Sequence, residues 1–213
     1  MDWDSADGKA RIAALLKDKA APPGSDFRNA PLAKAKLESA RLIGVDFTGA
    51  MLLGASFWKA DLSEAILDDA NCALVQGLGM KFIKGRAKNA NWSRAQLGRA
   101  NLTEASFVDA NLDAAQLEEA VIERALFVNA KFAGAFLGKA KAAGADFTNA
   151  NLAGAHLQQG NFTGAKFTRA SLKGARAARS ILKGADFTEA GCDGLDLRAA
   201  ELDGPAPAGA ITG

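Results

Sequence analysis

The chain of 213 residues carries 26 basic and 24 acidic side chains, and its formal net charge of +2 favours neither nucleic acid nor a strongly charged partner. No apolar run approaches the roughly 20 residues of a membrane-spanning helix, and the start Met-Asp-Trp-Asp lacks the basic and apolar regions of a signal peptide. We therefore expect a cytoplasmic protein without membrane insertion, while secretion by a route without a signal peptide stays open.

Residues 1–24 are predicted to form a short α-helical cap followed by a Pro/Gly linker. Ser5 is a suitable N-cap, and Ile12, Leu15 and Leu16 share one face at helical spacing. Pro22-Pro23-Gly24 would end the helix. We expect this helix to cover the end of the structure that follows, because exposed strand edges invite aggregation. A targeting or membrane-surface helix is the alternative, and its four acidic and four basic residues weaken it.

From residue 25 to residue 204 one five-residue pattern repeats without a slip. It reads Ala, a polar residue that is often Asp or Asn, Leu or Phe, and then two mostly small or polar residues. The large apolar position recurs from Phe27 to Leu202, which gives 36 copies. A period of five fits neither an α-helix nor a regular strand, whereas a short extended piece followed by a tight turn fits it. Gly ends twelve of the copies, as expected for a turn that needs positive φ.

Phe recurs at the large apolar position with a period of 20 residues, which indicates four sides per coil and about nine coils. We number the sides 1 to 4 by the residues Phe27, Leu32, Leu37 and Leu42. The predicted core ladder of side 1 is Phe27, Phe47, Phe107, Phe127, Phe147, Phe167 and Phe187. These rings and the small Ala two positions earlier would point inward and fill the interior. At about 4.8 Å per stacked strand, nine coils form a rod of roughly 43 Å.

The tandem Ala-Asp/Asn-Leu/Phe-x-x copies, such as the two within residues 145–154, resemble the pentapeptide-repeat family over residues 25–204. The resemblance implies an all-β solenoid, a right-handed quadrilateral β-helix, and a role other than that of an enzyme. The best-understood members of that family bind DNA gyrase as mimics of duplex DNA and protect it from quinolones. Many other members have no assigned role.

The pattern weakens between residues 72 and 90. The usual central and inward residues are replaced there by Cys72, Val75, Gly77, Met80, Gly85 and Ala87. Because the frame is kept, we predict repacked coils in which Val75 and Met80 refill the space lost at Gly77. A functional kink is the alternative. After Gly204 the repeat ends, and residues 205–213 are predicted to be a flexible tail.

No group of residues suggests catalysis, a cofactor or a metal site. His156 lies at an outward position without a second His, and a filled rod offers no pocket for converging groups. Cys72 and Cys192 are both central residues of side 2, six coils or roughly 29 Å apart. That separation exceeds the roughly 7 Å limit for a disulfide, so both are expected to be small buried apolar residues.

The charged residues do not single out a nucleic-acid function. Side 1, the most acidic, has eight acidic and five basic outward residues, whereas a mimic of duplex DNA needs about one negative charge per 1.7 Å. Gyrase binding therefore stays as the alternative function. Direct binding of nucleic acid is not expected, because acidic residues interrupt the basic residues of side 3, which are Lys36, Lys59, Arg99, Lys139, Arg176, Arg179 and Arg198.

Outward apolar residues of the first three coils indicate a function more strongly than the charged residues do. The candidate partner surface consists of Ile43, Met51, Leu53, Trp58, Ile66, Leu74, Leu78 and Ile83. Such patches mark interfaces, so either the N-terminal helix covers them or they bind another protein, with a second copy of this chain among the candidates. A looser set consists of Val121, Leu126, Val128, Phe136 and Ile181. The sequence thus predicts a protein-binding or scaffold module whose partner it does not identify.

Overall fold

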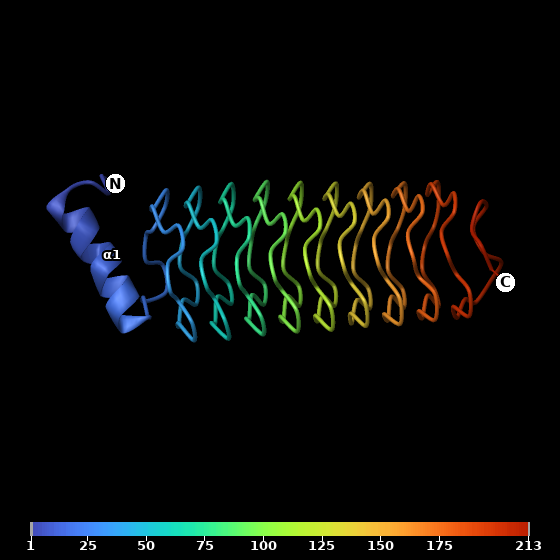
Figure 1. Cartoon of the computed structure of the whole chain (residues 1–213), viewed down its shortest axis with the longest axis horizontal. Helices are drawn as coiled ribbons and strands as arrows, with labels where there is room; N and C mark the ends of the chain where they lie inside the picture. Colours follow the sequence, from blue (N-terminus) through green and yellow to red (C-terminus); the bar gives the residue numbers. More distant parts are fainter. Residues whose placement is uncertain (1, 213) are drawn as a thin grey trace.

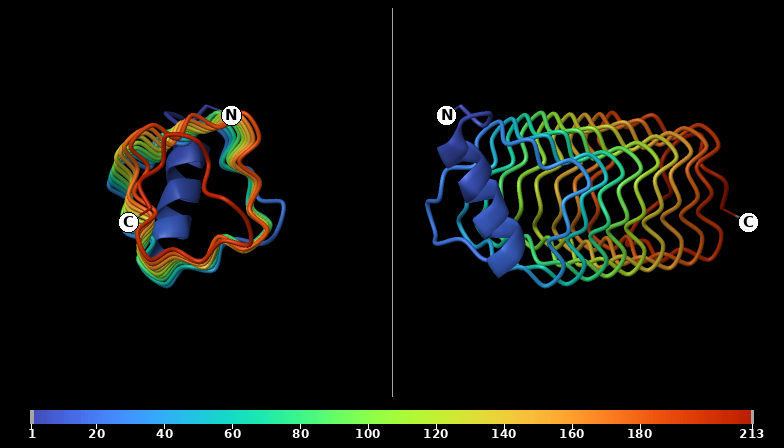
Figure 2. Two further views of the ribbon diagram at one scale, coloured as in Figure 1. Left: turned by 90° about the vertical axis from the view of Figure 1, so that its right-hand side faces the viewer. Right: turned by 60° about the vertical axis from the view of Figure 1, so that its left-hand side comes forward.

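The computed structural model describes residues 2–212 as one helix followed by a straight stack of coils (Figure 1). Helix α1 spans Ala6–Asp18. The coils contain no long strands; their extended residues are joined by isolated parallel bridges, mostly between residues twenty apart, from Asp26↔Asp46 to Ile181↔Glu201. This spacing is four repeats per turn, so the stack is a quadrilateral β-helix, and the end-on view in Figure 2 shows its four sides.

Each corner of the coil is a tight turn built from one repeat. At the first corner the Ala30 N–H donates to the Phe27 carbonyl over 3.1 Å, and Asn29 between them has φ of 58°. The same left-handed backbone recurs at Leu74, with φ of 58°, and at Gly54, with φ of 65°. The prediction that Gly and Asn supply these corners is therefore incomplete, because many bulkier residues adopt positive φ despite its cost of about 1–2 kcal/mol each.

The preference for Asp or Asn in the second position of the repeat has a local cause. The Asp46 carboxylate accepts the Thr48 backbone N–H over 2.9 Å, and the Asn101 side chain accepts the Thr103 N–H over 3.1 Å. Side chains of this kind commonly bond the backbone two residues on and so stabilise a turn. The Asp or Asn of such a repeat therefore lies on the surface and stabilises the turn that follows it.

Aromatic and aliphatic ladders fill the interior. The rings of Phe127, Phe147 and Phe167 stack at centroid distances of 5.1 and 5.3 Å. All seven residues of the predicted Phe ladder lie inside the coil, and only Phe187, in the last coil, is partly exposed. Stacked rings at these centroid distances are one of the arrangements that aromatic pairs favour.

The irregular coils of residues 72–90 keep the five-residue repeat but fill the interior with different side chains. The Met80 side chain occupies the space that a side chain at Gly77 would need, as predicted. Trp92, fully buried, packs edge-on against Phe107 at 5.8 Å and fills the interior beside the small Ala87. Figure 1 shows these coils in line with their neighbours, so the alternative of a kink is not supported.

Helix α1 lies across the N-terminal end of the rod and replaces a missing coil on side 1. Trp3 stacks on Phe27 at 5.8 Å, and its indole N–H donates to the Arg28 carbonyl over 2.8 Å. The Arg11 guanidinium donates to the Asp26 carbonyl over 2.8 Å. Leu15 is 2% exposed and belongs to the core cluster. Side chains of the cap thus satisfy backbone acceptors that would otherwise have no coil beside them.

Residues 205–212 form a partial turn on the C-terminal end, where the sequence predicts a flexible tail. The Gly194 N–H donates to the Gly209 carbonyl over 2.9 Å. The Leu197 N–H donates to the Ile211 carbonyl over 2.7 Å, and the Ile211 N–H donates to the Leu195 carbonyl over 2.8 Å. Ile211 sits in a bridge with Asp196. The backbone of the last coil explains this pairing, because its edge offers donors and acceptors that the tail can reach.

Phe147→Ala should lower the free energy of unfolding by about 3–5 kcal/mol, the usual cost of deleting a buried ring. Phe147 is stacked on both faces, whereas Phe187, at the end of the ladder, is stacked on one. Phe187→Ala is therefore the matched comparison and should cost clearly less. Chemical unfolding followed by circular dichroism measures both, and equal losses would contradict the ladder.

Leu15→Asp should make the protein associate, because a charge at this buried position lifts α1 from the end of the core. Ala14→Asp places the same charge on the exposed side of the helix and should leave the mass unchanged. Light scattering on both variants checks this. A Leu15→Asp variant that keeps the wild-type mass would show that α1 does not protect the end.

Candidate partner-binding surface

Five of the eight predicted surface residues are well exposed. The exposed fractions are 48% for Met51, 37% for Leu53, 44% for Trp58, 47% for Leu74 and 47% for Leu78. We call these five residues the corner patch. Ile43, Ile66 and Ile83 are only partly exposed.

The corner patch lies within two neighbouring coils; four of its residues border side 3, and Met51 lies on side 2. Leu53 and Leu74 occupy the corner between sides 2 and 3, and Trp58 and Leu78 occupy the next corner. Trp58 and Leu78 are one coil apart, and the Lys59 N–H donates to the Leu78 carbonyl over 3.1 Å. Two apolar ridges therefore flank one polar face of the rod.

Between the ridges side 3 is slightly hollowed. The depression is lined by Lys34, Lys36, Glu38, Gly54, Ser56, Leu74, Gln76 and Gln96. On the far ridge the Lys59 ammonium lies 4.5 Å from the centroid of the Trp58 ring, a contact that favours one orientation of the indole. The arrangement offers apolar contact at its edges and hydrogen-bonding groups along its floor.

The remaining predicted residues belong to another part of the surface. Ile43 and Ile83 lie at the corner between sides 4 and 1, and Ile66 lies on side 1. Ile43 lines a second depression together with Asp18, Ala20, Ala21, Pro22, Pro23 and Arg41. Of the eight predicted residues, Ile43 therefore borders the N-terminal segment. The five residues of the corner patch stay exposed.

The looser apolar set does not form one surface. Leu126, 43% exposed, and Val128 belong to side 1, Phe136 belongs to side 3, and Val121 and Ile181 belong to side 4. Phe136 packs against His156 with ring centroids 4.6 Å apart. These residues therefore give isolated contacts rather than a second patch.

Both cysteines of the chain lie in the interior of the rod. Cys72 and Cys192 are both free and buried, and burial raises the pKa of the Cys72 thiol well above its ordinary value. Within residues 2–212 no three His, Cys, Asp or Glu residues lie close enough to hold a metal ion. In the same part of the chain, no helix combines the length and the apolar character that crossing a bilayer requires.

Charges on the rod pair between neighbouring coils. Lys81 lies 3.9 Å from Asp61, and Lys166 lies 3.7 Å from Asp146, in each case at the same position of the next coil. The Arg124 guanidinium lies 2.9 Å from the Glu104 carboxylate, also one coil away. Exposed pairs of this kind add little stability, but they leave no side of the rod uniformly acidic.

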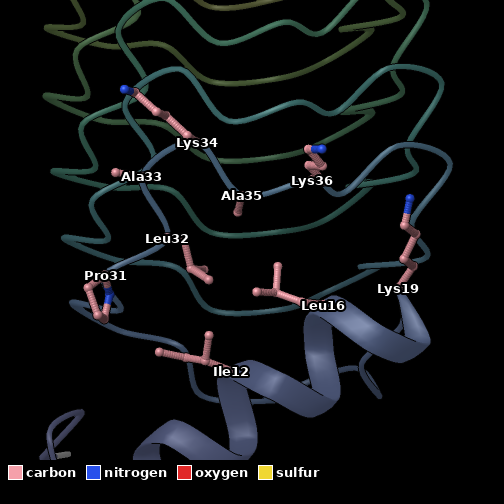
Figure 3. Close-up of a pocket in the computed structure, with 9 residues that line it drawn as sticks. All are labelled: Ile12, Leu16, Lys19, Pro31, Leu32, Ala33, Lys34, Ala35 and Lys36. Atoms are coloured by element: carbon pink, nitrogen blue, oxygen red, sulfur yellow. The ribbon is translucent and has the colours of Figure 1, made fainter.

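A groove that the sequence did not predict separates α1 from the first coil (Figure 3). Ile12 and Leu16 point into it from the helix, and Leu32 and Ala35 face them from the coil. Lys19, at the end of α1, forms an ion pair of 2.8 Å with Glu38. The sequence shows the apolar face of the helix but not how far the helix extends across the end of the rod.

The sequence profile of the family described as pentapeptide repeats matches residues 23–49, 30–69, 86–115, 110–149, 130–169, 145–184 and 165–204. The unmatched stretch 70–85 overlaps the irregular stretch 72–90 and contains Leu74 and Leu78 of the corner patch. Proteins of this family form the right-handed quadrilateral β-helix, and this is the fold of the chain. Comparison with curated proteins gives no match.

Several solved structures are similar to this chain. HetL, a pentapeptide repeat protein of Nostoc sp. involved in the regulation of heterocyst differentiation, is 24% identical over 95% of each chain, with a TM-score of 0.40. A trypsin-treated form of QnrB1, a plasmid-mediated fluoroquinolone resistance protein, is 19% identical over 84% of this chain and 86% of its own, with a TM-score of 0.51. A pentapeptide repeat protein of the Arabidopsis thaliana thylakoid lumen is 27% identical over 53% of this chain and 68% of its own, with a TM-score of 0.26. The likeness to QnrB1 supports the fold alone.

Lys19→Met should raise the pKa of Glu38, which is now lowered from 4.5 to about 2 by the hydrogen bond from Lys19, then by its own backbone N–H and by Ser56. The folded-state pKa is the lower one, so the ion pair stabilises the fold above pH 4.5 and this contribution disappears as the pH falls through about 2. An NMR titration of the Glu38 carboxyl group measures the shift toward 4.5. Lys17→Met, on the exposed side of the helix, should leave the midpoint unchanged. An unmoved midpoint in Lys19→Met would contradict the pairing.

Proposed function

This chain belongs to the pentapeptide-repeat family, and we propose that it is a non-enzymatic scaffold module that binds a protein partner through the corner patch. The observation that carries this proposal is the exposure of five large apolar side chains within two neighbouring coils. Side chains of this size are more often placed inside a protein, and several of them exposed close together mark an interaction site. We place this interaction in the cytoplasm.

The rigidity of the rod favours binding without rearrangement. The backbone on either side of Trp58 is fixed by bonds to the next coil, such as Phe57 N–H to the Gln76 carbonyl at 2.8 Å. A surface that is ordered before it binds loses less conformational entropy on association. Trp is also the residue type most enriched among dominant contacts of interfaces. Trp58 is therefore our candidate for the central contact, with Leu78 beside it.

The charge arrangement does not favour the alternative of gyrase binding through duplex mimicry. A mimic needs rows of unpaired acidic groups, whereas Asp61, Asp146 and Glu104 each face a basic residue on a neighbouring coil. The chemistry of an enzyme is not favoured either, since the interior is filled by the ladders and Cys72 is buried. We accordingly treat residues 25–204 as the binding rod and residues 1–24 as its cap.

Trp58→Asp should weaken partner binding at least about thirtyfold, because losing a dominant contact costs 2 kcal/mol or more. Leu126→Asp is the matched control, since Leu126 is equally exposed, at 43%, on another side of the rod. Immobilised wild type and both variants are compared for the proteins that they retain from extracts of the source cells. Light scattering of each variant tests a second copy as the partner. Equal retention by wild type and Trp58→Asp, with unchanged mass, would overturn the assignment of the patch.

A further inference from the structure

Among the described residues, the cap bonds to the backbone of the first coil on two of its four sides. Trp3 and Arg11 bond to side 1, and the Lys19 carbonyl accepts the Arg41 N–H on side 4 over 2.8 Å. On sides 2 and 3, within residues 2–212, the cap bonds to no backbone group of the first coil, and its ion pair with side 3 joins the side chains of Lys19 and Glu38. Within residues 2–212, the outward edge there leaves four carbonyls without a hydrogen-bond partner, those of Pro31, Ala33, Lys36 and Glu38.

The second coil shows what these carbonyls would accept. There the Met51 carbonyl accepts the Leu32 N–H over 2.9 Å, and the Leu53 carbonyl accepts the Lys34 N–H over 2.8 Å. Pro31 and Ala33 occupy the same two positions one coil earlier. An occupant must therefore bring N–H donors two residues apart, as an extended peptide does when it adds to a sheet edge.

The groove beside this edge has room for side chains. It has a volume of about 520 Å³ and lies between Ile12 and Leu16 of α1 and residues 31–36 of the first coil (Figure 3). The floor is apolar, while the Lys34 and Lys36 ammonium groups stand at its rim. A strand lying here would direct its apolar residues toward Leu32 and Ala35.

The rim specifies the charge of the occupant. Lys34 and Lys36 have no ion-pair partner within residues 2–212. Elsewhere on the rod, several basic residues at these two repeat positions meet an acidic residue at the same position of the neighbouring coil, as in Lys81–Asp61, Lys166–Asp146, Arg124–Glu104 and Arg99–Glu119. A strand that replaces the missing coil should therefore carry acidic residues over Lys34 and Lys36, separated by one inward-facing residue.

We propose that the groove between α1 and residues 31–36 binds an extended acidic peptide segment of a partner protein, added as a parallel strand to the first coil. Its amides donate to the Pro31 and Ala33 carbonyls, and its two carboxylates pair with Lys34 and Lys36. A fatty acid could supply a carboxylate but no row of N–H donors, so the edge favours a peptide. This site goes beyond the corner patch and does not depend on it.

The test uses a fluorescent peptide built from two repeats, acetyl-Ala-Asn-Leu-Ser-Glu-Ala-Asp-Leu-Ser-Gly-amide, and fluorescence anisotropy at low ionic strength. The peptide should bind the wild-type chain, and its counterpart with Lys in place of Glu and Asp should not. Methylating the amide nitrogen of the first Leu, which faces the Pro31 carbonyl, should weaken binding about threefold or more, since one hydrogen bond is lost. Added salt should weaken binding as well.

Charge reversal of the protein gives the sharper comparison. Lys34→Glu with Lys36→Glu should lose the acidic peptide and bind the Lys peptide. Lys139→Glu with Lys141→Glu is the matched control, because these exposed lysines hold the same repeat positions on a distant coil; it should behave as wild type. Trp58→Asp should also leave the peptide bound, which separates this site from the corner patch. No binding to wild type, equal binding to Lys34→Glu/Lys36→Glu, indifference to methylation, or binding of oleate instead of the peptide would each overturn the proposal.

Discussion

Hydrogen bonding between neighbouring coils is the constraint on which the rest of this structure depends. A donor such as the Leu32 N–H finds its acceptor on Met51, in the next coil, over 2.9 Å. All four sides must therefore have the same length in every coil, or the ladder of bonds would break on one side. The unbroken frame of the sequence follows from this requirement, as does the placement of every side chain. Residues twenty apart become neighbours, so inward rings stack into ladders and outward charges meet their counterparts.

The repeat determines the fold so fully that the sequence predicts it well. The period of five, the Phe bias every 20 residues and the inward Ala predict the four sides and the ladder from Phe27 to Phe187 that the structure contains. The surface is less predictable, because an outward position does not reveal how far a side chain is covered. Ile43 and Leu53 hold the same position in their repeats, yet Ile43 borders the cap and Leu53 is exposed. The tail and the groove escape prediction for a related reason, since residues outside the repeat have no period from which to infer their contacts.

The irregular coils and the corner patch are two aspects of one stretch of chain. Gly77 leaves a gap inside the coil that Met80 fills, while Leu74 and Leu78, on either side of that glycine, are exposed. Apolar volume is thus reduced at one inward position and increased at two outward ones within a stretch of five residues. This is also where the family profile does not match the chain. The coil that departs from the family pattern therefore supplies two of the five residues of the proposed binding surface, Leu74 and Leu78, whereas the regular coils beyond residue 90 mainly extend the rod.

The twenty-residue register also means that the length of the rod changes in steps of one coil. The corner patch and the groove lie near one end, and the distance from them to the other end is a whole number of coil heights of about 4.8 Å each. A gene that gains or loses 60 bases would lengthen or shorten this distance by one step and leave every ladder, corner and ion pair in phase. A gain or loss of whole codons that is not a multiple of 60 bases would rotate all later side chains around the axis. Spacing between binding partners can thus evolve in discrete steps, independently of the surfaces that hold them.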